Sequence, residues 1–279
     1  MLKKENQSGI NKVLIQAIDF KDESDALYEQ IKSLSDSELN KKTAFKDWSI
    51  NNIIGHLHTW NIAADRSLTS NDDFAEYVKI FNIEYSKRQK MSDFEKVFLD
   101  GREGVDLIQL WNKYCHEVSD RFKLADPKKR VKWMGPDMSV KSSITARLME
   151  TWAHGQAIYD ALGVLRVNED RIKNITVLGN NTFRWCYTVH GRSLPEVIPY
   201  LKLTAPSGEI WTFNDASEEN VIQGKAEDFC QVVTQVRNIA DVKLNLVGDI
   251  AKEWMSIAQC FAGPAESPPA AGSRFTVIK

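Results

Sequence analysis

The sequence predicts a mainly α-helical protein with a small α+β part: a four-helix bundle over residues 1–163, followed by an α+β domain over residues 164–279. Two observations support this division. Apolar residues recur at helical spacing in four long segments of the first part, which is the helix content of a four-helix bundle with one extended connection. After Gly163 the pattern changes, and short segments of alternating apolar and polar residues appear between the helical ones.

Three of the four long helices are expected before residue 125. In order, the predicted segments are a helix at 10–34, a break at 35–38, a helix at 49–68, a loop at 71–73, a short helical piece at 74–81 and a helix at 102–124. The apolar phase of the first helix shifts near Phe20. Ser49 is a natural N-cap for the second helix, and Trp48 and Ile53 can form a hydrophobic staple across it.

The fourth helix, at 139–163, shows the clearest period in the chain and follows a linking segment at 127–137. Its end residues, Ser139 and Gly163, suit an N-cap and a helix C-terminus. Beyond it we expect a helix at 170–187, a proline-bearing connector at 191–199, a β-hairpin of strands 200–204 and 210–213, a short strand at 221–222, a helix at 226–238, a strand at 243–247, a helix at 250–261 and a tail at 263–273. The composition of the tail predicts a segment that is disordered or draped on the surface.

The composition excludes several classes of protein. With 36 basic and 38 acidic residues, the net charge of −2 supplies no field for nucleic acid or an anionic membrane. The four cysteines are far apart and form no C-x-x-C pair, which is typical of reduced, partly buried thiols in a cytoplasmic protein. The N-terminal residues lack the apolar core of a signal peptide, and no run approaches the ~20 apolar residues that span a bilayer. Phosphate-loop, dinucleotide and nucleophile-elbow motifs are also absent from the sequence.

The fourth helix carries a pair of residues with metal-ligand spacing. Glu150 and His154 are four positions apart, so their side chains are neighbours beside the apolar stripe. A carboxylate and an imidazole placed in this way can bind one divalent ion together. The same spacing is common on ordinary helices, and Arg147 can pair with Glu150 instead. A third ligand is therefore needed from another part of the chain.

Two histidines of the second helix are candidates for this third ligand. His56 and His58 lie on opposite flanks of its apolar face, because residues two apart on a helix point about 200° away from each other. Periodicity alone does not choose between them. An isolated histidine in such a position is as well explained by a hydrogen bond to a neighbouring helix.

Three motifs together resemble a known family. They are D-W-S-I-N-N-I-I-G-H-L from Asp47, M-E-T-W-A-H-G-Q-A from Met149 and L-T-A-P-S-G-E-I-W-T-F from Leu203. The combination resembles the DinB-type metal-binding four-helix bundles, in the group around mycothiol-dependent maleylpyruvate isomerase. Within that group the chain looks similar to uncharacterised bacterial metal-binding proteins, some of which carry the label "wyosine base formation domain". The resemblance covers nearly the whole chain and implies a DinB-like bundle followed by the α+β domain.

The resemblance implies a metal site made of His56, Glu150 and His154. Two imidazoles and one carboxylate leave a fourth position open on a tetrahedral zinc ion, although nickel or iron accepts the same ligands. His58 then becomes a second-shell or pocket residue, with an ordinary helix-surface histidine as the alternative. The family's assisting arginine falls near Arg237, but displaced by one position and without the family's glycine, so a surface or helix-terminal arginine is the better interpretation.

The implied function is that of an isomerase or transferase that uses a low-molecular-weight thiol and a divalent metal on a small electrophile. The alternative is a non-catalytic metal-binding protein, because a fold does not determine an activity. We expect a cleft between the two domains, with the C-terminal domain closing one end of it. The expected partners are a small-molecule substrate and, as an open possibility, a second copy of the chain.

Overall fold

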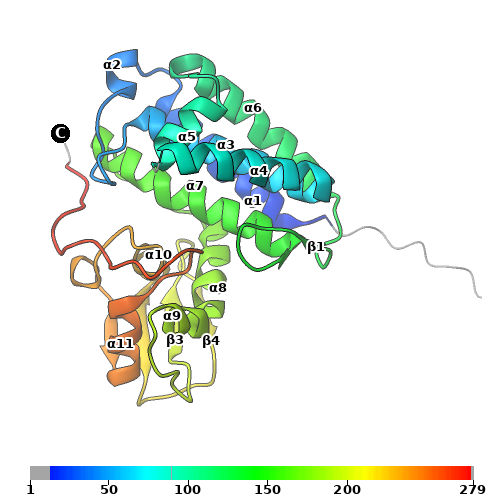
Figure 1. Cartoon of the computed structure of the whole chain (residues 1–279). Helices are drawn as coiled ribbons and strands as arrows, with labels where there is room; N and C mark the ends of the chain where they lie inside the picture. Colours follow the sequence, from blue (N-terminus) through cyan, green and yellow to red (C-terminus); the bar gives the residue numbers. More distant parts are fainter. Residues whose placement is uncertain (1–12, 89, 278–279) are drawn as a thin grey trace, which may run out of the picture.

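The computed structural model describes residues 13–88 and 90–277, and it contains the expected bundle. Helices α1 and α3 each pack on both α6 and α7 (Figure 1). The bounds of these four helices are Ile15–Ile31 for α1, Ile50–Thr69 for α3, Gly104–Lys123 for α6 and Val140–Leu162 for α7. The predicted class, a mainly helical chain with a four-helix bundle and a small α+β part, is confirmed. Residues 10–12, at the start of the first predicted helix, lie outside the described ranges.

Short polar residues and one glycine determine where two of these helices begin and end. The Oγ of Ser49 accepts the backbone N–H of Asn52 at 3.2 Å, and the Asn52 side chain accepts the Ser49 N–H at 3.0 Å. At the start of α7, Ser139 Oγ accepts the N–H of Ser142. This helix ends at Gly163, whose φ of 73° is strained for residues with a Cβ. The predicted caps at Ser49, Ser139 and Gly163 are therefore correct.

The region between the bundle helices is more helical than predicted. The bounds of its helices are Asp36–Leu39 for α2, Asn71–Arg88 for α4 and Met91–Phe98 for α5. The predicted loop at 71–73 was wrong, because Ser70 accepts the N–H of Asp73 at 3.2 Å and starts a helix there. Asp72 and Asp73 lie in the first turn, where negative charge stabilises the helix dipole. A polar run that we interpreted as a loop is thus a helix N-terminus.

The C-terminal part is a four-stranded sheet covered by short helices. The sheet has the order β4-β3-β5-β6, with β3 parallel to β5 and the other neighbours antiparallel. The bounds are Lys173–Asn181 for α8, Phe183–Val189 for α9, Tyr200–Thr204 for β3, Ile210–Phe213 for β4, Val221–Lys225 for β5, Ala226–Val233 for α10, Asn245–Val247 for β6 and Asp249–Ile257 for α11. The predicted helix at 170–187 is interrupted at Thr182, and the one at 226–238 ends at Val233. A two-stranded ladder of β1 (Arg130–Val131) and β2 (Met138–Ser139) precedes α7.

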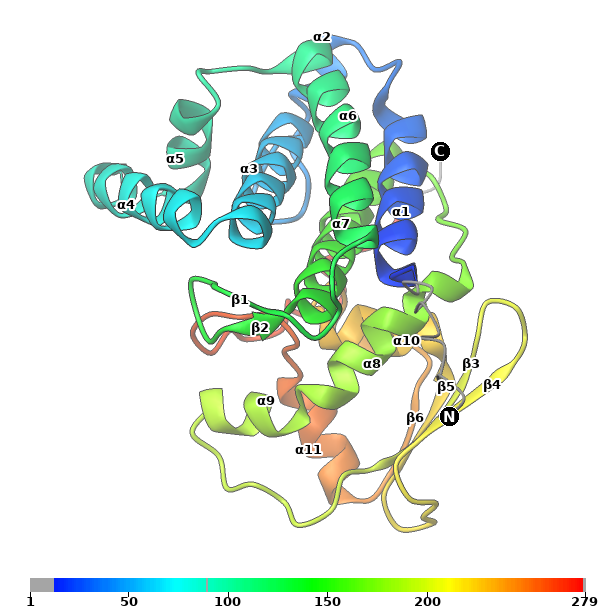
Figure 2. The same ribbon diagram turned by 90° about the vertical axis from the view of Figure 1, so that its right-hand side faces the viewer.

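Helix α7 belongs to both parts of the molecule. Its residues Ile144 and Leu148 are buried in the core of the bundle. Met149 and Trp152 instead join the second core, which the sheet and the C-terminal helices enclose. In Figure 2 this helix runs from the bundle toward α8, which it contacts. Side chains on successive turns of one helix therefore fix the bundle against the C-terminal part.

The C-terminal tail returns from α11 to the bundle. Asn238 donates a hydrogen bond to the carbonyl of Pro269 at 2.8 Å, and Asp241 accepts the N–H of Gly272 at 2.8 Å. Further on, the hydroxyl of Thr276 donates to Asp160 of α7 at 2.6 Å. Figure 1 shows the tail, in red, rising beside the bundle. Of the two predicted alternatives, the structure has the draped one.

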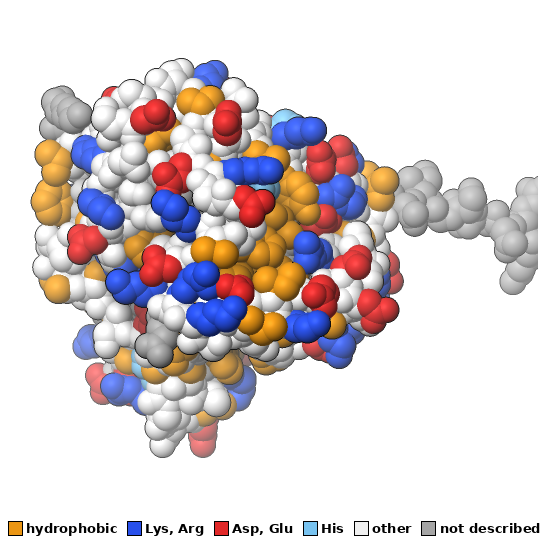
Figure 3. All heavy atoms as spheres, turned by 45° about the horizontal axis from the view of Figure 1, so that its top comes forward, with side chains coloured by type: hydrophobic (Ala, Val, Ile, Leu, Met, Phe, Trp, Pro, Cys, Tyr) orange, Lys and Arg blue, Asp and Glu red, His pale blue; other side chains and the backbone are white. Residues whose placement is uncertain are grey.

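The surface and the cysteines agree with the charge and thiol patterns of the sequence. On the face drawn in Figure 3, basic and acidic side chains are interspersed around apolar patches. All four cysteines are free and buried. Among the described helices, none combines the length and the hydropathy required to cross a membrane.

Candidate metal centre

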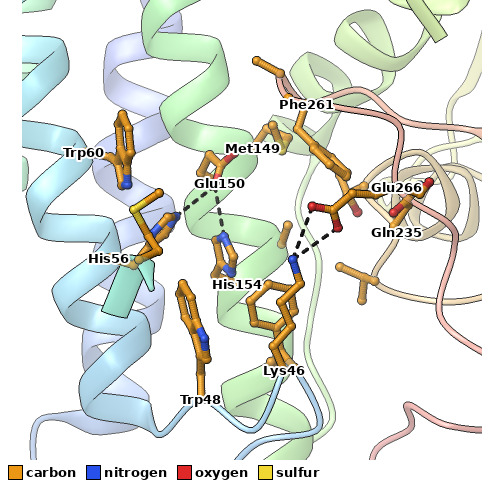
Figure 4. A pocket seen from close by; sticks show the side chains of 18 of the residues that line it. Lys46, Trp48, His56, Trp60, Met149, Glu150, His154, Gln235, Phe261 and Glu266 are labelled. Atoms are coloured by element: carbon orange, nitrogen blue, oxygen red, sulfur yellow. Dashed lines mark hydrogen bonds and ion pairs between the residues drawn. The ribbon is translucent and has the colours of Figure 1, made fainter. Parts of the chain in front are cut away.

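Three predicted ligands from two helices converge on one point. His56 projects from α3, and Glu150 and His154 project from adjacent turns of α7 (Figure 4). The Nε2 atom of His154 lies 3.0 Å from Glu150 Oε2, and the Nε2 atom of His56 lies 3.7 Å from the same oxygen. One ligand atom of each residue can be chosen so that all three atoms lie within 4.8 Å of one another. The structure thus brings together residues that are far apart in the sequence.

This arrangement fits a divalent ion. Bonds of about 2.0–2.1 Å to a tetrahedral zinc ion hold its ligand atoms about 3.3 Å from one another. The separations of 3.0 and 3.7 Å lie on either side of this value. Two imidazole nitrogens and a carboxylate oxygen are also donors that zinc, nickel and iron accept. The two separations from Glu150 Oε2 are thus close to those of a bound ion, and the whole set, within 4.8 Å, would contract around it.

The sequence analysis missed Glu95, which holds His56 from the other side. Its Oε1 atom lies 2.6 Å from His56 Nδ1 and accepts a hydrogen bond from Trp60 Nε1 at 3.2 Å. Glu95 lies on α5, in a segment for which we predicted no helix, and only 2% of it is exposed. A signal was present in the sequence, because Glu95 occurs between Phe94 and Phe98 on the apolar face of a short amphipathic segment.

Two aromatic rings hold the imidazoles in place. The Phe45 ring meets the edge of His154 at a centroid distance of 4.8 Å. Trp48 lies parallel to His154 at 6.2 Å and edge-on to His56 at 5.2 Å. Between these aromatic residues, Lys46 has a φ of 49° and the next residue is also left-handed, with a φ of 56°. Such backbone is costly for residues with a Cβ, and it turns both rings toward the ligands.

Burial and the neighbouring charges fix the protonation of the ligands. Burial alone would raise the pKa of Glu150, but hydrogen bonds from His154 and His56 hold it well below its ordinary value. Burial, with the nearby charge of His56, lowers the pKa of His154. For His56 burial is outweighed by Glu95 and Glu150, which raise its pKa to about 9. Glu150 is therefore ionised and His154 neutral near pH 7, the forms that bind metal. A bound cation would displace the proton of His56.

The ligands open into a cavity of about 670 Å³ between the bundle and the C-terminal part. This volume lies within the usual range for a small-molecule site. Its inner wall is apolar and comes from the bundle and the segment before α7. Its outer wall comes from residues 234–237 and from the tail. The lining of the cavity includes Lys46, Trp60, Trp133, Met134, Arg147, Asp160, Arg237, Glu266 and Arg274.

His58 and Arg147 both differ from what the sequence predicted. His58 is 2% exposed, packs edge-on against Tyr114 at 5.3 Å and is absent from the lining of the cavity. It is a core residue, and both the pocket and the helix-surface interpretations were wrong. Arg147 does not pair with Glu150; its Nε donates to Asn61 Oδ1 at 2.9 Å, and its side chain lines the cavity.

Arg237 is a wall residue of the cavity. We expected a surface or helix-terminal arginine, but Arg237 is 7% exposed and its Nη2 donates to Asp160 Oδ1 at 2.7 Å. The reason is Gln235, whose φ of 55° turns the chain inward just after α10 ends. Arg274, from the tail, was not predicted at all, and its guanidinium lies 5.3 Å from the centre of the Phe45 ring.

Comparisons with known proteins agree with this architecture. Residues 20–159 match the model of the mycothiol maleylpyruvate isomerase N-terminal domain family. The uncharacterized proteins MT0041 and Rv0036c, from two strains of Mycobacterium tuberculosis, are each 33% identical over 247 residues, which cover 88% of this chain and 95% of each relative.

Solved structures share the fold at low sequence identity. The crystal structure of the mycothiol-dependent maleylpyruvate isomerase has a TM-score of 0.50 and covers 83% of this chain and 91% of its own. A histidine-to-alanine mutant of that enzyme has a TM-score of 0.51 and covers 80% and 88%. Both are 12% identical to this chain, so they bear on the fold alone. Together with the family match and the relatives, they confirm the predicted resemblance: the chain belongs to the mycothiol maleylpyruvate isomerase N-terminal domain family.

Proposed function

We propose that the protein is a metal-dependent enzyme that uses a low-molecular-weight thiol to isomerise a small electrophile or to form an adduct with it. The observation that carries the proposal is the three-donor cluster at the wall of a large cavity. Among the described residues, no fourth histidine, cysteine or carboxylate joins the cluster of His56, Glu150 and His154. A site with three protein ligands keeps a position for a substrate, as catalytic zinc sites do.

The cysteines of the chain support an external thiol. Burial raises the pKa of Cys115 and Cys230 to about 12 and that of Cys186 to about 11, and it raises the pKa of Cys260 well above its usual range. None of the four lines the cavity. Because the thiolate is the nucleophilic form, these buried thiols are inert. A thiol-dependent reaction in this cavity therefore needs a thiol that arrives as a ligand.

In the proposed isomerisation a thiolate adds to one carbon of a conjugated double bond, and the electron pair moves to the carbonyl oxygen. The former double bond rotates, the electron pair returns, and the same carbon–sulfur bond breaks. A bound divalent ion would lower the pKa of the thiol and stabilise the negative oxygen. If the adduct instead takes up a proton while the carbon–sulfur bond is intact, the thiol stays on the electrophile and the reaction is a transfer.

The other residues of the cavity have separate roles in this proposal. Trp60, Trp133 and Met134 make the inner wall apolar, which excludes water from the reacting atoms. On the outer wall Arg237 is paired with Asp160, whereas Arg274 makes no ion pair within the described part of the chain. We assign to Arg274 the binding of an anionic group on the electrophile.

A cobalt-substituted protein provides the test. Protein purified without an affinity tag is loaded with one equivalent of Co²⁺, and absorption is recorded while a panel of bacterial thiols is added. We expect a new thiolate-to-cobalt absorption band, and turnover of maleyl- or epoxide-type acceptors only when thiol and metal are both present. Stoichiometric metal binding with neither a new band nor turnover would leave the non-catalytic metal-binding protein as the function.

A further inference from the structure

We infer that Glu95 is a positioning residue for the metal centre: it holds His56 with Nδ1 protonated, so that Nε2 is free to bind the ion. The inference rests on the proposed metal site and adds to it a carboxylate from a helix outside the four-helix bundle. It concerns the strength of metal binding rather than the chemical step.

The hydrogen-bond partners of Glu95 define the tautomer. The indole N–H of Trp60 can only donate, so Glu95 Oε1 accepts there at 3.2 Å. The same oxygen lies 2.6 Å from His56 Nδ1, which donates to the carboxylate. In a neutral imidazole the proton is then on Nδ1, and the lone pair is on Nε2. Nε2 is the atom that faces Glu150, at 3.7 Å from its Oε2. A carboxylate behind a histidine ligand orients the ring and makes it a stronger donor.

The burial of Glu95 is hard to explain by folding alone. The residue is 2% exposed, and its Oε2 has no hydrogen-bond partner among the described residues. A buried carboxylate with an unsatisfied oxygen costs free energy, by several kcal/mol per ion in typical proteins. The nearest compensation in the described chain is His56 itself, whose Nδ1 lies 2.6 Å from Oε1. The buried Arg147 makes no ion pair there, and neither residue bonds to Oε2. A divalent ion beyond His56 would offset the rest.

Aromatic packing fixes the position of this carboxylate. Helix α5 contacts α3 and α4. Phe94 meets the edge of Phe81 at 5.0 Å, and Phe98 meets Tyr77 at 5.3 Å. Glu95 lies between these two anchors and has little freedom to move away from His56. The segment formed by α4 and α5 thus places the carboxylate of Glu95 behind His56.

The experiment compares Glu95→Gln with a matched surface change, Glu103→Gln. Glutamine retains the shape and an acceptor oxygen but removes the charge. Glu103 also contacts α5, through Lys96 at 2.7 Å, but its side chain is 44% exposed. Zinc dissociation constants are measured on tag-free protein by competition with a chromophoric chelator. We expect E95Q to weaken zinc binding by about 10- to 100-fold, as for other outer-shell carboxylates, and E103Q to leave it unchanged.

Two further readouts separate positioning from a structural role. The rise in melting temperature on adding zinc should be smaller in E95Q than in the wild type, because a ligand stabilises the folded state more, the more tightly it binds. Nitrogen-15 spectra of the zinc-loaded protein should show a hydrogen-bonded Nδ1–H on His56 in the wild type and a weaker hydrogen bond there in E95Q. Glu95→Asp, which keeps the charge on a shorter side chain, should bind zinc more tightly than E95Q and serves if E95Q fails to fold.

The outcomes distinguish this inference from the proposed function. Wild-type protein that binds no zinc would overturn both. Wild-type protein that binds one zinc ion, with E95Q of equal affinity and an equal rise in melting temperature on adding zinc, would overturn only the role of Glu95.

Discussion

Replacing Glu23 by glutamine should lower the free energy of unfolding by about 3 kcal/mol. Glu23, on α1, is 3% exposed and lies between Arg166 and Arg171, which lead into the C-terminal part. Its Oε1 contacts Arg166 Nη2, and its Oε2 accepts from Arg171 Nε at 2.7 Å. Removing one partner from a buried ion pair typically costs about 3–5 kcal/mol. Glutamine retains one acceptor, so we expect the lower end of this range.

In E23Q the charge of Arg166 would remain buried without its partner. The Arg166 guanidinium lies 4.8 Å from the Trp152 ring centre and 5.0 Å from that of Tyr159, and its side chain is only 4% exposed. It is therefore held in place and cannot recover hydration when Glu23 loses its charge. Glu29→Gln on the same helix is the control, because Glu29 is 57% exposed and, among the described residues, forms an ion pair with Lys32 alone. This change should alter stability by no more than about 0.5 kcal/mol.

The assay is urea unfolding followed by circular dichroism, repeated across pH. Burial would raise the pKa of Glu23, but the charges of Arg166 and Arg171 outweigh it and leave the pKa lowered. The contribution of Glu23 is therefore fully present above its unfolded pKa of about 4.3 and is lost as the pH falls through the lowered folded value. The difference between wild type and E23Q should be constant from pH 6 to 8, because this range begins about two units above that pKa. A difference under about 1 kcal/mol at pH 7, or one that grows on acidification, would refute the reasoning.

Two other changes test the metal centre and the cavity. His154→Ala should reduce the metal content of tag-free protein to a small fraction, whereas His58→Leu should leave it unchanged, because His58 faces the core; elemental analysis of both variants checks this. Ending the chain at Gly263 removes Arg274 and the Glu266–Lys46 ion pair from the outer wall. The shortened protein should bind zinc with wild-type affinity but lose most thiol-dependent turnover, and equal loss of both would contradict the assignment of the tail to the substrate.

The three candidate ligands could be identified from the sequence because their placement depends on local regularity. Glu150 and His154 are on one face of a helix with a clear apolar period, and the structure keeps that helix unbroken from Val140 to Leu162. His56 could be separated from His58 only by the resemblance, since their two flanks are equivalent in a periodic pattern. The structure shows the physical difference: one flank of α3 faces α5 and α7, and the other packs against Tyr114.

The parts that could not be predicted depend on where the chain goes after an irregular residue. Gln235, just after the end of α10, is left-handed, a conformation that residues other than glycine adopt rarely and that the sequence pattern does not predict. That single turn moves Arg237 from a helix surface to the wall of the cavity. The position of Arg274 depends on two hydrogen bonds that hold the tail: Asn238 donates to the carbonyl of Pro269, and Asp241 accepts from the N–H of Gly272. The composition of that tail resembles that of a disordered segment. Glu95 was missed because its partner His56 is 39 residues away.

In the proposed function, residues of the bundle bind the metal, and residues of the outer wall of the cavity act in turnover. His56, Glu150 and His154 all lie on bundle helices, within the residues 20–159 that match the family. The outer wall comes from residues 234–237 and the tail, so it contributes none of the three candidate ligands. A protein that served only to hold metal would need no such wall. The wall nevertheless includes Arg237, which is 7% exposed and donates a hydrogen bond to Asp160 of α7. Retention of zinc with loss of turnover in the shortened chain is therefore the result that would favour an enzyme over a metal-binding protein.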